Sequence, residues 1–145
     1  MSNVERTSRS SMMPRLAAVG ASVLAALAVW AVARMLRGAD VMSPGYGISM
    51  PAQTIELVWI IVVPLVMALA GWGLLALLER IAPTQAGRIW TIVALLVLVV
   101  SLAVPLTGNG VTTGDRVVLA CLHIAVGVVL IVGMTRTSTA GARAY

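Results

Sequence analysis

The chain has 145 residues, of which 60% are hydrophobic and only 10% are charged. A soluble domain is typically about 25% charged and cannot bury so much apolar surface at this length, so the composition excludes an ordinary soluble protein. The net charge of +5 comes from ten arginines and five acids, with no lysine. Because the arginines stand at the ends of apolar runs and not on one basic face, they indicate membrane orientation and argue against nucleic-acid binding.

The first part of the chain combines a polar segment with an apolar run. Residues 1–15 are serine-rich and carry three arginines, so we expect a mobile tail. The apolar run that follows predicts a transmembrane helix over about residues 16–36. Small residues recur on two of its faces at four-residue spacing, which lets a neighbouring helix approach closely. These two sets are Ala17, Ala21 and Ala25, and Ala18, Ser22 and Ala26.

The same segment also has features of a signal peptide. A basic leader precedes the apolar run, and Ala31-Val32-Ala33 fits a small-x-small cleavage site. However, the run is longer than the roughly 7–15 apolar residues that signal peptides use. We therefore expect a retained helix, with cleavage before Arg34 as the alternative. Cleavage would leave the orientation of the other helices unchanged.

Residues 34–54 form the longest predicted loop, and a second apolar run follows it. Glycine and proline punctuate the loop, which predicts turns without regular structure and an exposed Arg37–Asp40 pair of little energetic weight. The second helix is expected over about residues 55–79. Glu56 stands in its first turn, where the helix dipole favours a carboxylate, so capping is its simplest role.

Two further apolar runs predict helices over about residues 88–106 and 115–135. In the third helix, Pro105 leaves the carbonyl of Ser101 without its helical donor. Thr113 or Asp115 can cap the fourth helix. That helix contains an 18-residue stretch, residues 117–134, with no charge and one strongly polar side chain, His123. Residues 137–145 are expected to form a polar C-terminal tail.

The predicted architecture is an all-α, transmembrane four-helix bundle with up-down-up-down topology, formed by residues 16–136. Arginines give its orientation. The two terminal segments and the loop between the second and third helices carry seven of them, and the other side carries three. The positive-inside bias therefore predicts that both termini are cytoplasmic.

Several segments together resemble a known family. They are AGWGLLALLER (70–80), RIW (88–90), Ser101 with Pro105, and LHIAVGVVLIVG (122–133). With these segments the chain resembles an actinobacterial family of small four-helix integral membrane proteins of unknown function. The resemblance implies four helices and a plasma-membrane location, and it carries no activity. The absence of lysine and phenylalanine, whose codons are AT-rich, independently indicates a high-GC genome.

Three residues form the candidate intramembrane polar cluster: His123, Ser101 and Glu56. His123 shares a helix face with small residues and matches Ser101 in depth, so we expect it to donate to the freed Ser101 carbonyl and tie two helices together. Proton relay and ligand binding are the alternatives for His123. With one histidine and one cysteine, the sequence predicts no metal site, no cofactor and no catalytic triad.

Three functions remain open from the sequence. The leading hypothesis is a non-enzymatic interaction or accessory subunit, whose partners are the lipid bilayer and another membrane protein or a second copy. The first alternative is a small transporter or proton-coupled permease that uses His123, with Glu56 at its outer mouth. A membrane-embedded enzyme is the second alternative.

Overall fold

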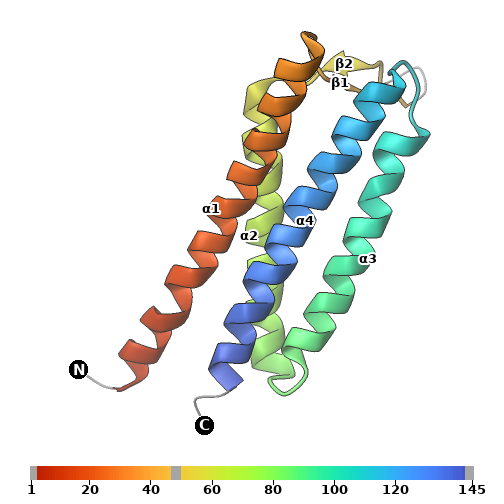
Figure 1. The fold of residues 1–145 in the computed structure, drawn as a ribbon. Helices are drawn as coiled ribbons and strands as arrows, with labels where there is room; N and C mark the ends of the chain where they lie inside the picture. The colour runs from red at the N-terminus through yellow and green to blue at the C-terminus, as the bar shows by residue number, and fades with distance from the viewer. Residues whose placement is uncertain (1–2, 47–49, 143–145) are drawn as a thin grey trace.

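A computed structural model describes residues 3–46 and 50–142 of the chain. Its helices are α1 (Asn3–Arg37), α2 (Leu57–Ile81), α3 (Ala86–Thr107) and α4 (Thr113–Ala142), and its strands are β1 (Met42–Ser43) and β2 (Gln53–Thr54). The helices alternate in direction, so the start of α1 and the end of α4 lie at the same end of the bundle (Figure 1). We call this the terminal end, and the opposite end, where the strands lie, the hairpin end.

All four helices contain a segment long and apolar enough to cross a membrane. The predicted all-α, four-helix up-down bundle is confirmed, and the chain has the architecture of a multi-pass membrane protein. Neighbouring helices pack in the order α1, α2, α3, α4 and back to α1, with the most extensive contact between α1 and α4. The outward faces of the helices expose large apolar side chains, as a lipid environment requires.

Both ends of the bundle differ from the predicted boundaries. Helix α1 begins at Asn3 and α4 ends at Ala142, so most of the two segments predicted as polar tails is helical. Helix nucleation is the costly step, and a helix already formed by apolar residues extends into polar neighbours at little cost. The segments able to cross a membrane are shorter, Met12–Arg37 in α1 and Thr113–Thr137 in α4.

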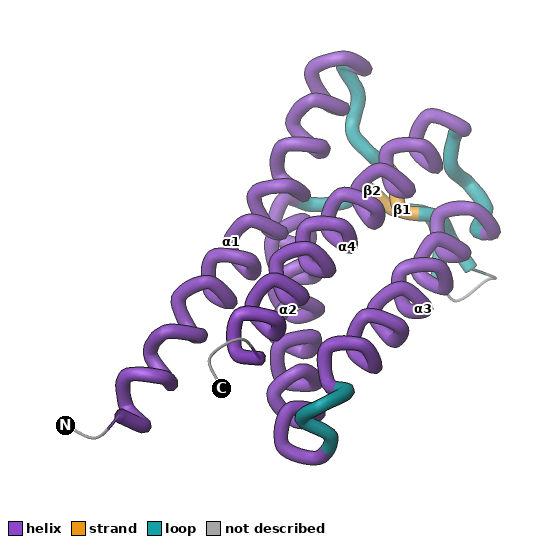
Figure 2. The backbone as a smooth tube through the Cα atoms, turned by 60° about the horizontal axis from the view of Figure 1, so that its bottom comes forward, coloured by secondary structure: helices purple, strands orange, loops and turns teal. Residues whose placement is uncertain are grey.

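The long loop after α1 is more regular than predicted. β1 and β2 pair antiparallel, with Met42 opposite Thr54, and Gly45 forms an isolated bridge with Asn109 in the loop between α3 and α4. Figure 2 shows the two strands lying across the hairpin end, beside the start of α4. An added Cβ at Gly45 would come within 2.6 Å of the Met50 carbonyl oxygen, so this crossing has no room for a side chain. The two connections at this end therefore form one joined unit.

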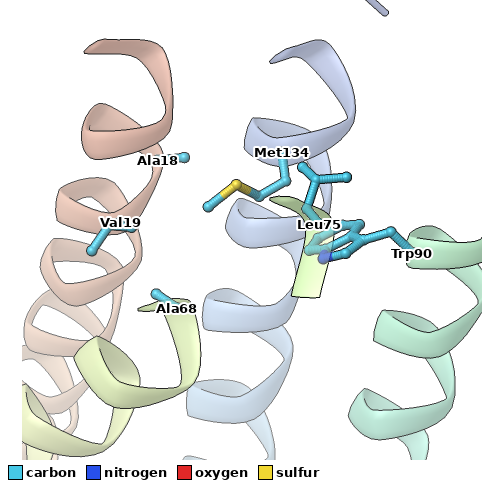
Figure 3. Packing of buried hydrophobic residues seen from close by; sticks show 6 residues of the cluster. All are labelled: Ala18, Val19, Ala68, Leu75, Trp90 and Met134. Atoms are coloured by element: carbon cyan, nitrogen blue, oxygen red, sulfur yellow. The ribbon is translucent and has the colours of Figure 1, made fainter. Parts of the chain in front are cut away.

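The interior contains two apolar clusters, one toward each end. The cluster toward the terminal end draws on all four helices (Figure 3) and comprises Ala18, Val19, Ala68, Leu75, Trp90 and Met134. Close approach of α1 and α4 is possible because Gly133 faces Ala18, where an added Cβ would lie only 2.6 Å from the alanine Cβ. Of the two small-residue faces predicted on α1, the one with Ala18, Ser22 and Ala26 is buried, whereas Ala17 and Ala21 are exposed.

Candidate functional site

His123 and Ser101 are half-buried, and each satisfies itself within its own helix. Nδ1 of His123 lies 2.7 Å from the Leu119 carbonyl oxygen, and the Ser101 hydroxyl donates to the Leu98 carbonyl at 2.7 Å. The predicted hydrogen bond between His123 and the third helix is therefore wrong. Serine commonly bonds to a carbonyl three or four residues earlier on its own helix. The His123 ring does the same here, with the Leu119 carbonyl in place of a partner on α3.

The face that carries His123 nevertheless meets a neighbouring helix, as predicted. Gly127, one turn further along α4, receives the side chain of Leu98 from α3, because an added Cβ would lie 2.7 Å from the Leu98 Cδ1 atom. Apolar packing, and not a polar bond, therefore joins α3 and α4 here.

Glu56, the third candidate residue, is exposed and is not bonded to the other two. It is the N-cap residue of α2, its side chain makes no capping hydrogen bond, and it is exposed. No hydrogen bond or ion pair joins it to His123 or Ser101 within the described ranges. Among the described residues, therefore, no hydrogen bond or ion pair links the three members of the predicted polar cluster.

The strongest polar constellation lies at the hairpin end and centres on Asp115, which is only 2% exposed. Its Oδ1 accepts from Arg37 Nη1 at 2.8 Å and from the Met42 backbone N–H at 3.3 Å. Its Oδ2 accepts from the backbone N–H and the hydroxyl of Thr112, at 3.0 and 2.7 Å. Asp115 therefore joins the end of α1, strand β1 and the start of α4.

Thr112 and Asp115 form a reciprocal cap on α4. The Asp115 backbone N–H donates to the Thr112 hydroxyl oxygen at 3.2 Å, and the carboxylate accepts from Thr112 in return. This is the capping-box arrangement, with aspartate in the third position. Sequence reasoning named Asp115 as a cap but missed Thr112 and the ion pair with Arg37. It paired Arg37 with Asp40, which binds Arg34 instead, at 2.8 Å.

Arg116 of α4 caps the C-terminal end of α3. Its guanidinium donates to three carbonyl oxygens at the C-terminal end of α3, those of Pro105 at 3.1 Å, Leu106 at 2.6 Å and Gly108 at 2.5 Å. The Tyr46 hydroxyl donates to the Val104 carbonyl. These donors satisfy carbonyls that have no partner at a helix C-terminus.

A third ion pair lies at the terminal end. Arg15 of α1 is buried, and its Nη2 lies 2.5 Å from Oε1 of Glu79 on α2. Its Nε also donates to the Thr137 hydroxyl on α4, at 3.4 Å. Sequence reasoning placed Arg15 in a solvated tail, because local composition cannot show that a polar residue at a helix end faces inward. Trp90 adds a bond from α3 to α2 through Nε1 and the Gly71 carbonyl, at 2.7 Å.

The contacts at these sites are ion pairs and hydrogen bonds between side chains and backbone groups. No group of three or more histidine, cysteine, aspartate or glutamate side chains gathers as a metal site in the part of the chain that the structure describes. Buried polar side-chain atoms among these residues all have hydrogen-bond partners. The polar groups that are brought together are the ion pairs of the two ends, and what they do is hold helices to one another.

Comparison with known proteins places the chain in a family without assigning it an activity. A family of unknown function, DUF6069, matches residues 6–140, which is nearly the whole chain. No curated protein and no solved structure matches it.

Proposed function

We propose that this chain, which belongs to the family of unknown function DUF6069, is a membrane-embedded interaction subunit that performs no chemistry of its own. In this role it binds another membrane protein, or a second copy of itself, through the outer faces of its helices. The observation that carries the proposal is that an ion pair ties helices together at each end of the bundle, Arg37–Asp115 at one and Arg15–Glu79 at the other.

Ion pairs between helices at both ends of the bundle favour a rigid protein over a transporter. Alternating access requires one end of a bundle to open while the other stays closed. Opening the hairpin end would separate Arg37 from a 2%-exposed Asp115, and opening the terminal end would separate Glu79 from the buried Arg15. Breaking a buried pair costs about 3–5 kcal/mol, since it leaves a charge without a partner. A fixed bundle with a fixed outer surface suits recognition.

The proposed setting is the plasma membrane of an actinobacterium, with both termini in the cytoplasm. The support is the arginine distribution, with seven arginines on the terminal side and three on the hairpin side, together with a lysine-free composition typical of high-GC genomes. The hairpin end then faces outward. The joined unit of the two outer connections would be the part of the chain that an extracytoplasmic partner meets.

Photo-crosslinking in intact cells tests this function. A photoreactive amino acid is placed at one outward position on each of three helices, Leu24, Val100 and Val117, which are 67%, 70% and 57% exposed. Leu75, which is fully buried, serves as the matched control. The proposal expects a discrete protein adduct from at least one outward position and none from the control, with the adduct identified by mass spectrometry.

Two outcomes would overturn the proposal. One is the lack of any discrete protein adduct from all three outward positions. The other is solute or proton flux by the purified protein in liposomes that is abolished by His123→Leu, because this would show that the permease reading is correct.

A further inference from the structure

The outer face of α2 carries a groove near the terminal end. It has a volume of about 300 Å³ and is lined by Gly73, Ala76, Leu77 and Arg80. These residues share one face of the helix because Ala76 and Leu77 lie three and four positions after Gly73, and Arg80 lies four and three positions after them. An added Cβ at Gly73 would meet no atom within 4 Å, and Leu77 is 53% exposed, so the groove opens away from the bundle.

Arg80 gives the groove one charged end. It stands in the last turn of α2, is exposed, and has no hydrogen-bond or ion-pair partner among the described residues. The adjacent carboxylate of Glu79 is already bound to Arg15 at 2.5 Å. The connection to α3, residues 82–85, contains no acid. The positive charge of Arg80 is therefore available to a ligand from outside the chain.

We propose that this groove binds an anionic phospholipid. The Arg80 guanidinium contacts the phosphate, and one acyl chain lies along Gly73, Ala76 and Leu77. Arginine matches phosphate with two parallel N–H donors, and its aliphatic stem covers apolar surface while the charged end reaches the headgroup level. A basic side chain at the membrane surface is attracted to anionic headgroups, and all four residues that line this groove belong to α2.

Charge favours a lipid over a second copy of the chain as the occupant. The chain carries a net charge of +5. Three of its five acids, Asp40, Glu79 and Asp115, are already in ion pairs, and Glu56 lies at the hairpin end, far along α2 from Arg80. The fifth acid, Glu5 in the first turn of α1, is a single carboxylate in a chain with ten arginines. A second copy therefore offers little negative charge to Arg80, whereas an anionic headgroup offers it directly.

Native mass spectrometry of the full-length protein in detergent tests the site. The protein is titrated with dioleoyl phosphatidylglycerol and, separately, with dioleoyl phosphatidylcholine, which has the same chains and no net charge. We expect phosphatidylglycerol to bind more tightly. Arg80→Gln should weaken its binding about five-fold, from the roughly 1 kcal/mol that one arginine contributes near an anionic surface. Gly73→Leu should weaken the binding of both lipids, because its side chain enters the groove and an added Cβ at this position meets no other atom within 4 Å.

Matched variants separate a groove from a general surface effect. Gly20→Leu is the control for Gly73→Leu, because an added Cβ at Gly20 also meets no atom within 4 Å and lies on α1. Arg88→Gln is the control for Arg80→Gln, since Arg88 is exposed at the same end and does not line the groove. Both controls should bind phosphatidylglycerol as the native protein does.

The proposal is wrong if Arg88→Gln weakens binding as much as Arg80→Gln, which would indicate non-specific attraction to charge. It is also wrong if Gly73→Leu leaves lipid binding unchanged, or if that variant abolishes a dimer, which would identify a second copy as the occupant. Competition by glycerol 3-phosphate at concentrations comparable to the lipid would likewise overturn it, because the acyl chain would then contribute nothing.

Discussion

Replacing Asp115 by alanine should lower the free energy of unfolding more than replacing Asp40, the other acid in an ion pair at the hairpin end. The carboxylate is 2% exposed and accepts four hydrogen bonds, from Arg37, Met42 and two donors of Thr112. Breaking a buried pair costs about 3–5 kcal/mol. The Arg37 side chain is 26% exposed and regains some hydration, which lowers the expected loss to about 2–4 kcal/mol.

Asp40→Ala is the matched control at the same end. The Arg34–Asp40 pair has the same length as Arg37–Asp115, 2.8 Å, but its side chains are 48% and 52% exposed. An exposed pair contributes about 0–1 kcal/mol, so this variant should be close to the native protein. The comparison therefore keeps residue type and ion-pair length constant. It varies burial together with the hydrogen bonds that Asp115 accepts from Met42 and Thr112.

Unfolding by sodium dodecyl sulfate in mixed micelles, followed by tryptophan fluorescence, gives the free energy of unfolding for each variant. A double-mutant cycle with Arg37→Ala isolates the coupling between the two charges. The reasoning is refuted if Asp115→Ala and Asp40→Ala differ by less than about 0.5 kcal/mol, which is within the additivity error of such comparisons.

Three further predictions concern His123, the contact between α1 and α4, and orientation. His123→Leu should change the free energy of unfolding by less than about 0.6 kcal/mol, the mean for a membrane hydrogen bond between helices, because His123 bonds within its own helix; a loss above 1.5 kcal/mol in the same assay would contradict this. Gly133→Ala should cost about 1–3 kcal/mol, because its Cβ would lie 2.6 Å from that of Ala18; a neutral variant would show that the two helices are not in close contact. In a chain whose native cysteine is replaced by serine, a membrane-impermeant maleimide should label Met50→Cys in intact cells and label Thr84→Cys only after lysis; the reverse pattern would mean that the termini are extracytoplasmic.

The architecture of this protein was largely readable from composition along the chain. Four apolar runs of about 20 residues each must span the hydrocarbon as helices, because a backbone in lipid has to satisfy its own hydrogen bonds. The short connections from α2 to α3 and from α3 to α4 then leave those helices antiparallel to their neighbours. Boundaries were less accurate, since α1 begins at Asn3 and α4 ends at Ala142. A helix continues into polar residues because adding a residue to an existing helix costs little free energy. The hydropathy of those residues does not show this.

The pairing of polar residues was decided by tertiary structure alone. Arg37 binds Asp115, 78 positions away, and not Asp40. Arg15 is buried against Glu79, whereas the sequence placed it in a tail. His123 bonds to its own helix and not to the third. Composition and spacing fix which residues share a face of one helix, but each residue turns a helix by about 100°. A small rotation or shift of one helix against the next therefore decides whether a side chain meets a partner, its own backbone or lipid.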